Sequence, residues 1–329
     1  MSALAPTLQA FFTDRLITQR RASPHTIAAY RDALRLLLVF VEHDAGKSPA
    51  TLDFDDLDAA RIGRFLDHLE QQRGNSVRTR NARLSAIHSL FRFAALRHPE
   101  HAALIARVLA IPPKRFQRGI VTFLTDAESD ALLQAPDRTT FLGRRDHALL
   151  LLAIQTGLRV SELIALCCGD VVLGTAAHVR CTGKGRKERA TPLTSATAAV
   201  LHAWLNERHG AAEQPLFPTR QGGALSRYTV TLLLARHVHT ATVHCPTLTT
   251  KTVTPHVLRH TAAMRLLAAG VDSSVIALWL GHESTQTTQI YVHADLALKE
   301  RALARTTPID TQPGRYRPPD KLLDFLESL

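Results

Sequence analysis

Four short clusters in the chain carry side chains that suit the chemistry of phosphate esters. They are Thr-Gly-Leu-Arg-Val-Ser-Glu-Leu at 156–163, a Gly-Lys-Gly turn around Lys184, His-Val-Leu-Arg-His at 256–260, and Leu-Gly-His at 280–282, followed by Tyr291. Guanidinium groups make paired hydrogen bonds to phosphate oxygens and stay protonated at working pH. A tyrosine hydroxyl becomes a nucleophile when its proton is removed. Together the residue types favour attack on a phosphate.

Each cluster also has a structural explanation. Arg159 could be a surface arginine whose partner at helical spacing is Glu162. Lys184 could be the solvated tip of a hairpin, and two further cations follow it closely. Tyr291 could be an ordinary buried aromatic residue, although its nine-residue step from His282 argues against this.

The remaining histidines favour structural roles. His260 is interpreted as a core or supporting residue beside His256. Another group has a spacing that matches no familiar zinc ligand set, so a zinc site is disfavoured there; it comprises His237, His239, His244 and Cys245.

Together the four clusters resemble the tyrosine recombinase (phage integrase) family, especially its Xer-like branch. They occur in the family's order and at its spacings. The segments Ser23-Pro24-His25-Thr26, with Tyr30, and Arg83-Leu84-Ser85-Ala86 also resemble the family's core-binding domain, so the resemblance spans nearly the whole chain. It implies a mainly α fold with a small β-sheet, in which a helical core-binding domain precedes a mixed α/β catalytic domain.

The resemblance also implies a catalytic set, and every position of that set is filled here. Its members are Arg159, Lys184, His256, Arg259, His282 and Tyr291. The arginines would stabilise the charge that develops on the phosphate oxygens. The resemblance implies that Tyr291 forms a 3′-phosphotyrosyl intermediate, while Glu162 supports the site from beside the first arginine.

The proton transfers that the reaction needs suggest roles for the other members of the set. The departing 5′-hydroxyl needs a proton, for which Lys184 is the candidate general acid, and His256 is the expected acceptor of the Tyr291 proton. His282 would brace the phosphate. This mechanism requires no metal, nucleotide or other cofactor.

The implied activity is site-specific recombination or integration of double-stranded DNA, for a mobile element. The expected assembly is a homo-tetramer on paired sites, or a mixed one with sister recombinases. Two alternatives stay open. One is a type IB topoisomerase-like relaxing enzyme that acts as a monomer, and the other is a non-catalytic DNA-binding accessory protein descended from a recombinase.

Composition agrees with a DNA partner. The 329 residues contain 40 Lys and Arg against 29 Asp and Glu, a net charge of +11, which suits a phosphate-rich ligand. The longest uncharged apolar run, Ala148–Ile154, is far too short to span a membrane. No secretion signal is apparent, so a cytoplasmic location without membrane contact is expected.

The basic residues concentrate between Gln71 and Arg118, where ten Lys and Arg accompany a single acid. A helix within this stretch can bury its apolar side and present arginines to a duplex. The cations expected to contact DNA are Arg78, Arg80, Arg83, Lys114 and Arg115. The alternative is an ordinary solvated basic face.

Periodicity divides the chain into four parts that would position these groups. Residues 1–110 are expected to form the helical DNA-binding domain, 111–123 a basic linker, 124–305 the catalytic domain, and 306–329 a tail with a short amphipathic helix. Within the catalytic domain, 179–182 and 188–193 predict a β-hairpin around Lys184. The tail helix is expected to dock either on its own domain or on a neighbouring protomer.

Overall fold

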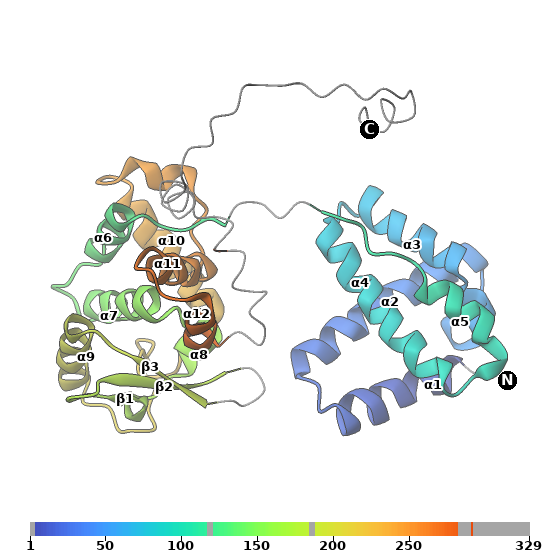
Figure 1. The fold of residues 1–329 in the computed structure, drawn as a ribbon, viewed down its shortest axis with the longest axis horizontal. Helices are drawn as coiled ribbons and strands as arrows, with labels where there is room; N and C mark the ends of the chain where they lie inside the picture. The colour runs from blue at the N-terminus through green and yellow to red at the C-terminus, as the bar shows by residue number, and fades with distance from the viewer. Residues whose placement is uncertain (1–3, 117–120, 184–187, 282–290, 292–329) are drawn as a thin grey trace, which may run out of the picture. The chain divides into compact units, whose positions relative to one another are not determined.

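The computed structural model describes residues 4–116, 121–183, 188–281 and 291, and it divides into two units, 1–119 and 120–329 (Figure 1). The fold is mainly helical with one small sheet, which confirms the predicted class. None of the helices in the described ranges is long and apolar enough to cross a membrane.

The first unit is built only from helices in its described part. They are α1 (Leu4–Ala10), the π-helix η1 (Phe11–Gln19), α2 (Pro24–Ala45), α3 (Ala59–Gln71), α4 (Val77–Ala95) and α5 (Ala102–Leu109), with short 3₁₀ turns at Pro49–Thr51, Phe54–Leu57 and Pro99–His101. Local hydrogen bonding fixes the start of α2, because the Ser23 hydroxyl accepts from the N–H of Thr26 and Pro24 occupies the first turn.

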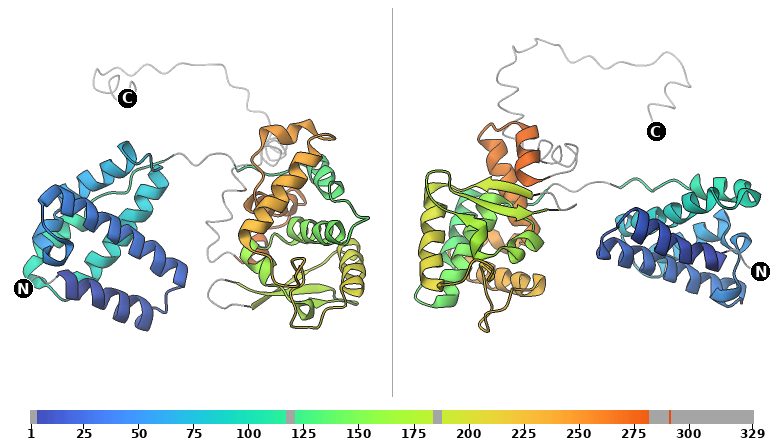
Figure 2. Two further views of the ribbon diagram at one scale, coloured as in Figure 1. Left: turned by 180° about the vertical axis from the view of Figure 1, so that it is seen from behind. Right: turned by 90° about the horizontal axis from the view of Figure 1, so that it is seen from below.

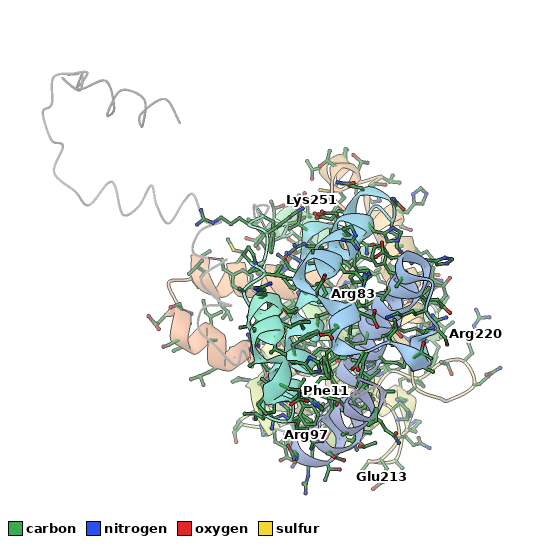
Figure 3. All side chains as sticks on the ribbon, turned by 90° about the vertical axis from the view of Figure 1, so that its right-hand side faces the viewer. Phe11, Arg83, Arg97, Glu213, Arg220 and Lys251 are labelled. Atoms are coloured by element: carbon green, nitrogen blue, oxygen red, sulfur yellow. The ribbon has the colours of Figure 1, made fainter. Side chains whose placement is uncertain are left out.

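Buried aromatic rings hold the first unit together. Phe11 packs against Phe93 and Tyr30, and Phe54 packs edge-on against Phe91. Figure 3 shows the side chains of this unit, with Phe11, Arg83 and Arg97 labelled.

The second unit combines helices with an antiparallel sheet in the order β1-β2-β3 (Figure 2). Its elements are α6 (Asp126–Gln134), α7 (Phe141–Thr156), α8 (Val160–Ala165), β1 (Val171–Val172), β2 (His178–Thr182), β3 (Glu188–Pro192), α9 (Ser195–Arg208), α10 (Arg227–Ala241), α11 (Pro255–Ala268) and α12 (Ser273–Leu280), with 3₁₀ turns at Cys168–Asp170 and Pro246–Thr250. The predicted hairpin is confirmed as β2 and β3, in a register that pairs Cys181 with Arg189.

A close approach between two helix ends shapes the site. Gly157 caps α7 in the left-handed conformation, with φ of 64°. A Cβ atom there would lie 2.6 Å from Cδ2 of Leu280, the last residue of α12. Glycine therefore lets the end of α7 lie directly against the end of α12, and the chain enters α8 three residues later, at Val160.

Candidate active site

Arg159 lies immediately before α8, and both its backbone and its side chain bond to Glu162. Its N–H donates to Oε2 of Glu162 at 2.8 Å, and its Nη1 donates to Oε1 at 2.9 Å. Its Nη2 donates to the carbonyl of Gly281 at 3.0 Å. Since the Arg159 side chain remains 30% exposed, the guanidinium is fixed in place yet accessible to a phosphate.

Arg259, on α11, is almost completely buried. Its Nη1 donates to the carbonyl of Gly157 and its Nη2 to the carbonyl of Leu280, both at 2.8 Å. Burial and the neighbouring charge of Arg159 lower the pKa of Arg259 to about 10. The guanidinium therefore remains charged at neutral pH.

The two arginines converge on the end of α12. Leu280 and Gly281 are consecutive, and their carbonyls accept from Arg259 and Arg159 respectively. Two guanidinium groups held by adjacent carbonyls form a concentrated positive charge, the kind of site that stabilises a phosphate in reaction. The structure thus brings together two members of the expected set that are 100 residues apart in the sequence.

The phenol of Tyr291 contacts a histidine. Its Oη lies 3.0 Å from Nδ1 of His260, and the two rings meet at 64°. Tyr291 is 1% exposed, within an apolar cluster that includes Met264 and Leu280. Burial raises the pKa of Tyr291, an effect opposed by the charges of Arg259 and Arg159. The phenol is therefore protonated at neutral pH in this arrangement.

His260, expected to be a core or supporting residue, is thus in contact with the phenol. His256 lies one helical turn earlier, and its ring meets the ring of His260 edge-on with centroids 4.7 Å apart. Burial, then the charges of His256 and Arg259, lower the pKa of His260 to about 4. Sequence patterns did not indicate this contact because Tyr291 lies 31 residues away.

Lys184 and His282 lie outside the described residues. The nearest described residues can be placed, however. Thr182 ends β2 and Glu188 begins β3, while Gly281 caps α12 and bonds to Arg159.

Arg189, on β3, also belongs to this region, although it was not among the residues expected from the sequence. Its Nη1 and Nη2 donate to the two carboxylate oxygens of Glu162 at 3.0 and 2.8 Å. A signal was available, because the alternation of β3 places residue 189 on the same face as the buried Thr191.

The five cations expected to contact DNA differ in exposure. Arg78, Lys114 and Arg115 are exposed, and Arg83 is half-buried. The guanidinium of Arg78 lies over the ring of Phe116, 5.6 Å from its centroid. These four remain candidates for contact with a phosphate backbone.

Arg80 does not fit that expectation. Its side chain is 6% exposed, and its Nη1 donates to the carbonyl of Pro112 at 3.3 Å and to Asn81 at 3.1 Å. The segment that follows α5 covers it, because Asn81 also exchanges two hydrogen bonds with the backbone of Lys114. Arg80 therefore anchors this segment to α4 rather than facing solvent.

Comparison with known proteins places the whole chain among related sequences. Residues 122–297 match the Phage integrase family, and residues 10–98 match the Phage integrase N-terminal SAM-like domain. A putative integrase/recombinase, y4rC, of Sinorhizobium fredii is 56% identical over 100% of this chain and 99% of its own length. The tyrosine recombinase XerC of Pelobacter propionicus is 36% identical over 90% of this chain and 93% of its own.

Solved structures show the same fold. The XerH site-specific recombinase bound to a palindromic difH substrate is similar over 87% of this chain and 81% of its own, with a TM-score of 0.68 and 23% identity. The Tn1549 transposon integrase in complex with circular intermediate DNA also has a TM-score of 0.68, at 17% identity, over 91% of this chain and 99% of its own.

Proposed function

The chain belongs to the phage integrase family of tyrosine recombinases, enzymes that cleave and rejoin DNA, and we propose that it does so through Tyr291. The observation that carries this assignment is the convergence of Arg159 and Arg259 on adjacent carbonyls at the end of α12. Two charged forks there would bind the scissile phosphate and stabilise its five-coordinate transition state.

Tyr291 attacks the phosphorus in this proposal, forming a 3′-phosphotyrosyl ester and releasing a 5′-hydroxyl. The attacking phenol must lose its proton, and His260 is the histidine within hydrogen-bond distance of it. We therefore assign His260, backed by His256, as the first acceptor of that proton. Lys184 would protonate the departing 5′-oxygen and His282 would brace the phosphate, as the family resemblance implies.

Since Tyr291 is 1% exposed, DNA binding must bring its phenol into reach of a phosphate.

The ester keeps the energy of the broken bond, so a second 5′-hydroxyl can reverse the step on another strand. Exchange of strands requires two sites, and we propose a tetramer on paired duplexes. The similar XerH recombinase is bound to its difH substrate and the Tn1549 integrase to circular intermediate DNA, which supports duplex DNA as the partner.

The biological task we propose is movement of a mobile element, carried out in the cytoplasm. The relative that matches the full chain at 56% identity carries the name integrase/recombinase, which favours integration over resolution of chromosome dimers. PCR with outward-directed primers that anneal on either side of the gene should then detect an excised circle in cells that express the wild-type protein. A Tyr291→Phe strain should yield none, and wild-type cells without circles would contradict this task.

A plasmid assay separates recombination from the alternatives. A binding site is first selected from a random duplex pool, and two copies of this selected site are placed in one supercoiled plasmid. We expect the DNA between the two sites to be deleted or inverted, with products of one defined length. The reaction should require both copies of the site. Relaxation without exchange would indicate a topoisomerase-like enzyme, and binding without either product would indicate an accessory protein.

A further inference from the structure

Arg189 connects three parts of the candidate site. It lies on β3, the second of the two paired strands between which Lys184 falls in the sequence. Its guanidinium makes a two-pronged salt bridge to Glu162, the residue that holds Arg159. The Arg189 and Glu162 side chains are 13% and 4% exposed, so solvent screens this pair little.

The same guanidinium packs against Gly281. A Cβ atom on Gly281 would lie 2.6 Å from Nη1 of Arg189, so only a glycine leaves room for the guanidinium there. The carbonyl of Gly281 accepts from Arg159. Arg189 therefore contacts both groups that fix the Arg159 side chain, the carboxylate of Glu162 and the backbone at Gly281.

Arg189 helps to keep the carboxylate of Glu162 charged. Burial raises the pKa of Glu162, but hydrogen bonds from Arg189 and from the backbone of Arg159 bring it below its usual value. Without Arg189, a buried carboxylate would keep one guanidinium partner instead of two. Of the hydrogen bonds to this carboxylate described above, only those from Arg159 would then remain, so Glu162 and Arg159 would be held less firmly.

From these contacts we propose that Arg189 is a positioning residue, which fixes Glu162 and Gly281 so that Arg159 meets the scissile phosphate in the reactive geometry. The inference rests on the proposed function, since it assigns Arg159 to that phosphate. Arg189 itself does not touch the DNA in this scheme. It acts on the rate of phosphodiester cleavage through a neighbouring arginine.

The test is single-turnover formation of the covalent protein–DNA adduct on a nicked duplex carrying the selected site. Arg189→Met is expected to slow adduct formation by roughly 100-fold, the usual effect of a small misplacement of a catalytic group. Arg189→Lys keeps the charge but not the two-pronged geometry, and its rate should fall between those of Arg189→Met and wild type.

Arg180→Ala is the matched control. It removes an exposed arginine from β2 of the same hairpin, which bonds only to the carbonyl of Gly169 among the described residues, and it should react at the wild-type rate.

A second substrate distinguishes positioning from a general structural defect. A methylphosphonate at the scissile position replaces a charged oxygen with a methyl group, so the reaction depends less on Arg159. We expect the Arg189→Met and Arg189→Lys defects to shrink to a few-fold on this substrate. Equal defects on both substrates, or wild-type rates on the ordinary phosphate, would overturn the proposal.

A double-mutant cycle provides a test that stays informative even if Arg189→Met folds poorly. In the Glu162→Gln background there is no carboxylate for Arg189 to pair with. Loss of Arg189 should therefore slow the reaction little further, because the two residues act as one unit. Multiplying defects would contradict the proposal. The wild-type protein distinguishes failure of the proposed function from failure of the inference about Arg189. If wild type forms no adduct, the proposed function fails. If wild type reacts and the Arg189 variants react equally fast, only the inference about Arg189 fails.

Discussion

Tyr291 and His260 show how a local contact can define a chemical role. A phenol buried among apolar side chains has a raised pKa, so it needs a neighbouring group that receives its proton during attack. His260 is neutral at physiological pH because its pKa lies near 4, and a neutral imidazole can accept that proton. In the proposed mechanism, the nucleophile and its proton acceptor are therefore already in contact in the protein without DNA.

Replacement of His260 by glutamine tests this role. Glutamine can still bond to the phenol but cannot take its proton, so we expect His260→Gln to slow adduct formation by about 100-fold or more. His256→Gln should have a smaller effect on the rate of proton removal. If His256→Gln were the more damaging variant and His260→Gln reacted normally, the original expectation for His256 would be restored.

The same histidine should make the second unit sensitive to acid. The pKa of His260 falls from 6.5 to about 4 on folding, so the unfolded chain binds a proton more readily. Its contribution to stability is complete above pH 6.5 and is lost as the pH falls toward 4. His260→Gln should therefore lose less unfolding free energy than wild type over that interval.

Tryptophan fluorescence can follow this unfolding selectively. Both tryptophans of the chain, Trp204 and Trp279, belong to the second unit. His239→Gln, at an exposed position of α10, is the control and should behave as wild type. An identical acid response in His260→Gln and wild type would contradict the predicted linkage.

At the scale of elements, α4 shows where sequence patterns succeed and fail. The helix expected between Gln71 and Arg118 is present as α4, and its start is capped by Ser76, whose side chain accepts from the N–H of Thr79. Such helix starts depend on local hydrogen bonds. The direction of Arg80 could not be predicted, since it depends on the segment after α5, more than 30 residues away. Likewise, β1 has only two residues and leaves no pattern to detect.

A pair of substitutions in α4 separates binding from stability. Arg78→Ala should weaken DNA binding and leave folding intact, because Arg78 is exposed. Arg80→Ala should instead lower the free energy of unfolding of the first unit by about 1 to 3 kcal/mol, since buried hydrogen bonds are lost. Far-UV ellipticity, compared with tryptophan fluorescence, isolates this transition. Equal losses of DNA affinity, with no change in unfolding, would refute the distinction.

The candidate site was predictable only in part for a similar reason. Arg159, Arg259 and Tyr291 could be named from their clusters, and the structure brings them to one region. The alternation of β3 could place Arg189 on the same face as Thr191, but its contact with Glu162, 27 positions away, has no local signal. The contact of His260 with Tyr291, 31 positions away, has none either. Glu162 was expected beside the first arginine, but its second guanidinium partner was not.

At the scale of the whole molecule, the net charge of +11 predicts binding that depends strongly on salt. Each cation that neutralises a backbone phosphate should contribute about 0.9 to the slope of log affinity against log salt. Arg115→Ala should therefore reduce the slope by about one unit on any sequence. Fluorescence anisotropy from low to physiological salt measures it, and an unchanged slope would exclude Arg115 from the DNA interface.

The central claim is that Tyr291 becomes joined to a DNA 3′-phosphate. The most direct measurement traps the adduct on a nicked duplex carrying the selected site, digests it with protease and nuclease, and identifies the modified peptide by mass spectrometry. We expect a nucleotide attached through its 3′-phosphate to Tyr291, and no adduct from Tyr291→Phe. Attachment to another residue, or an undiminished adduct from Tyr291→Phe, would contradict the account.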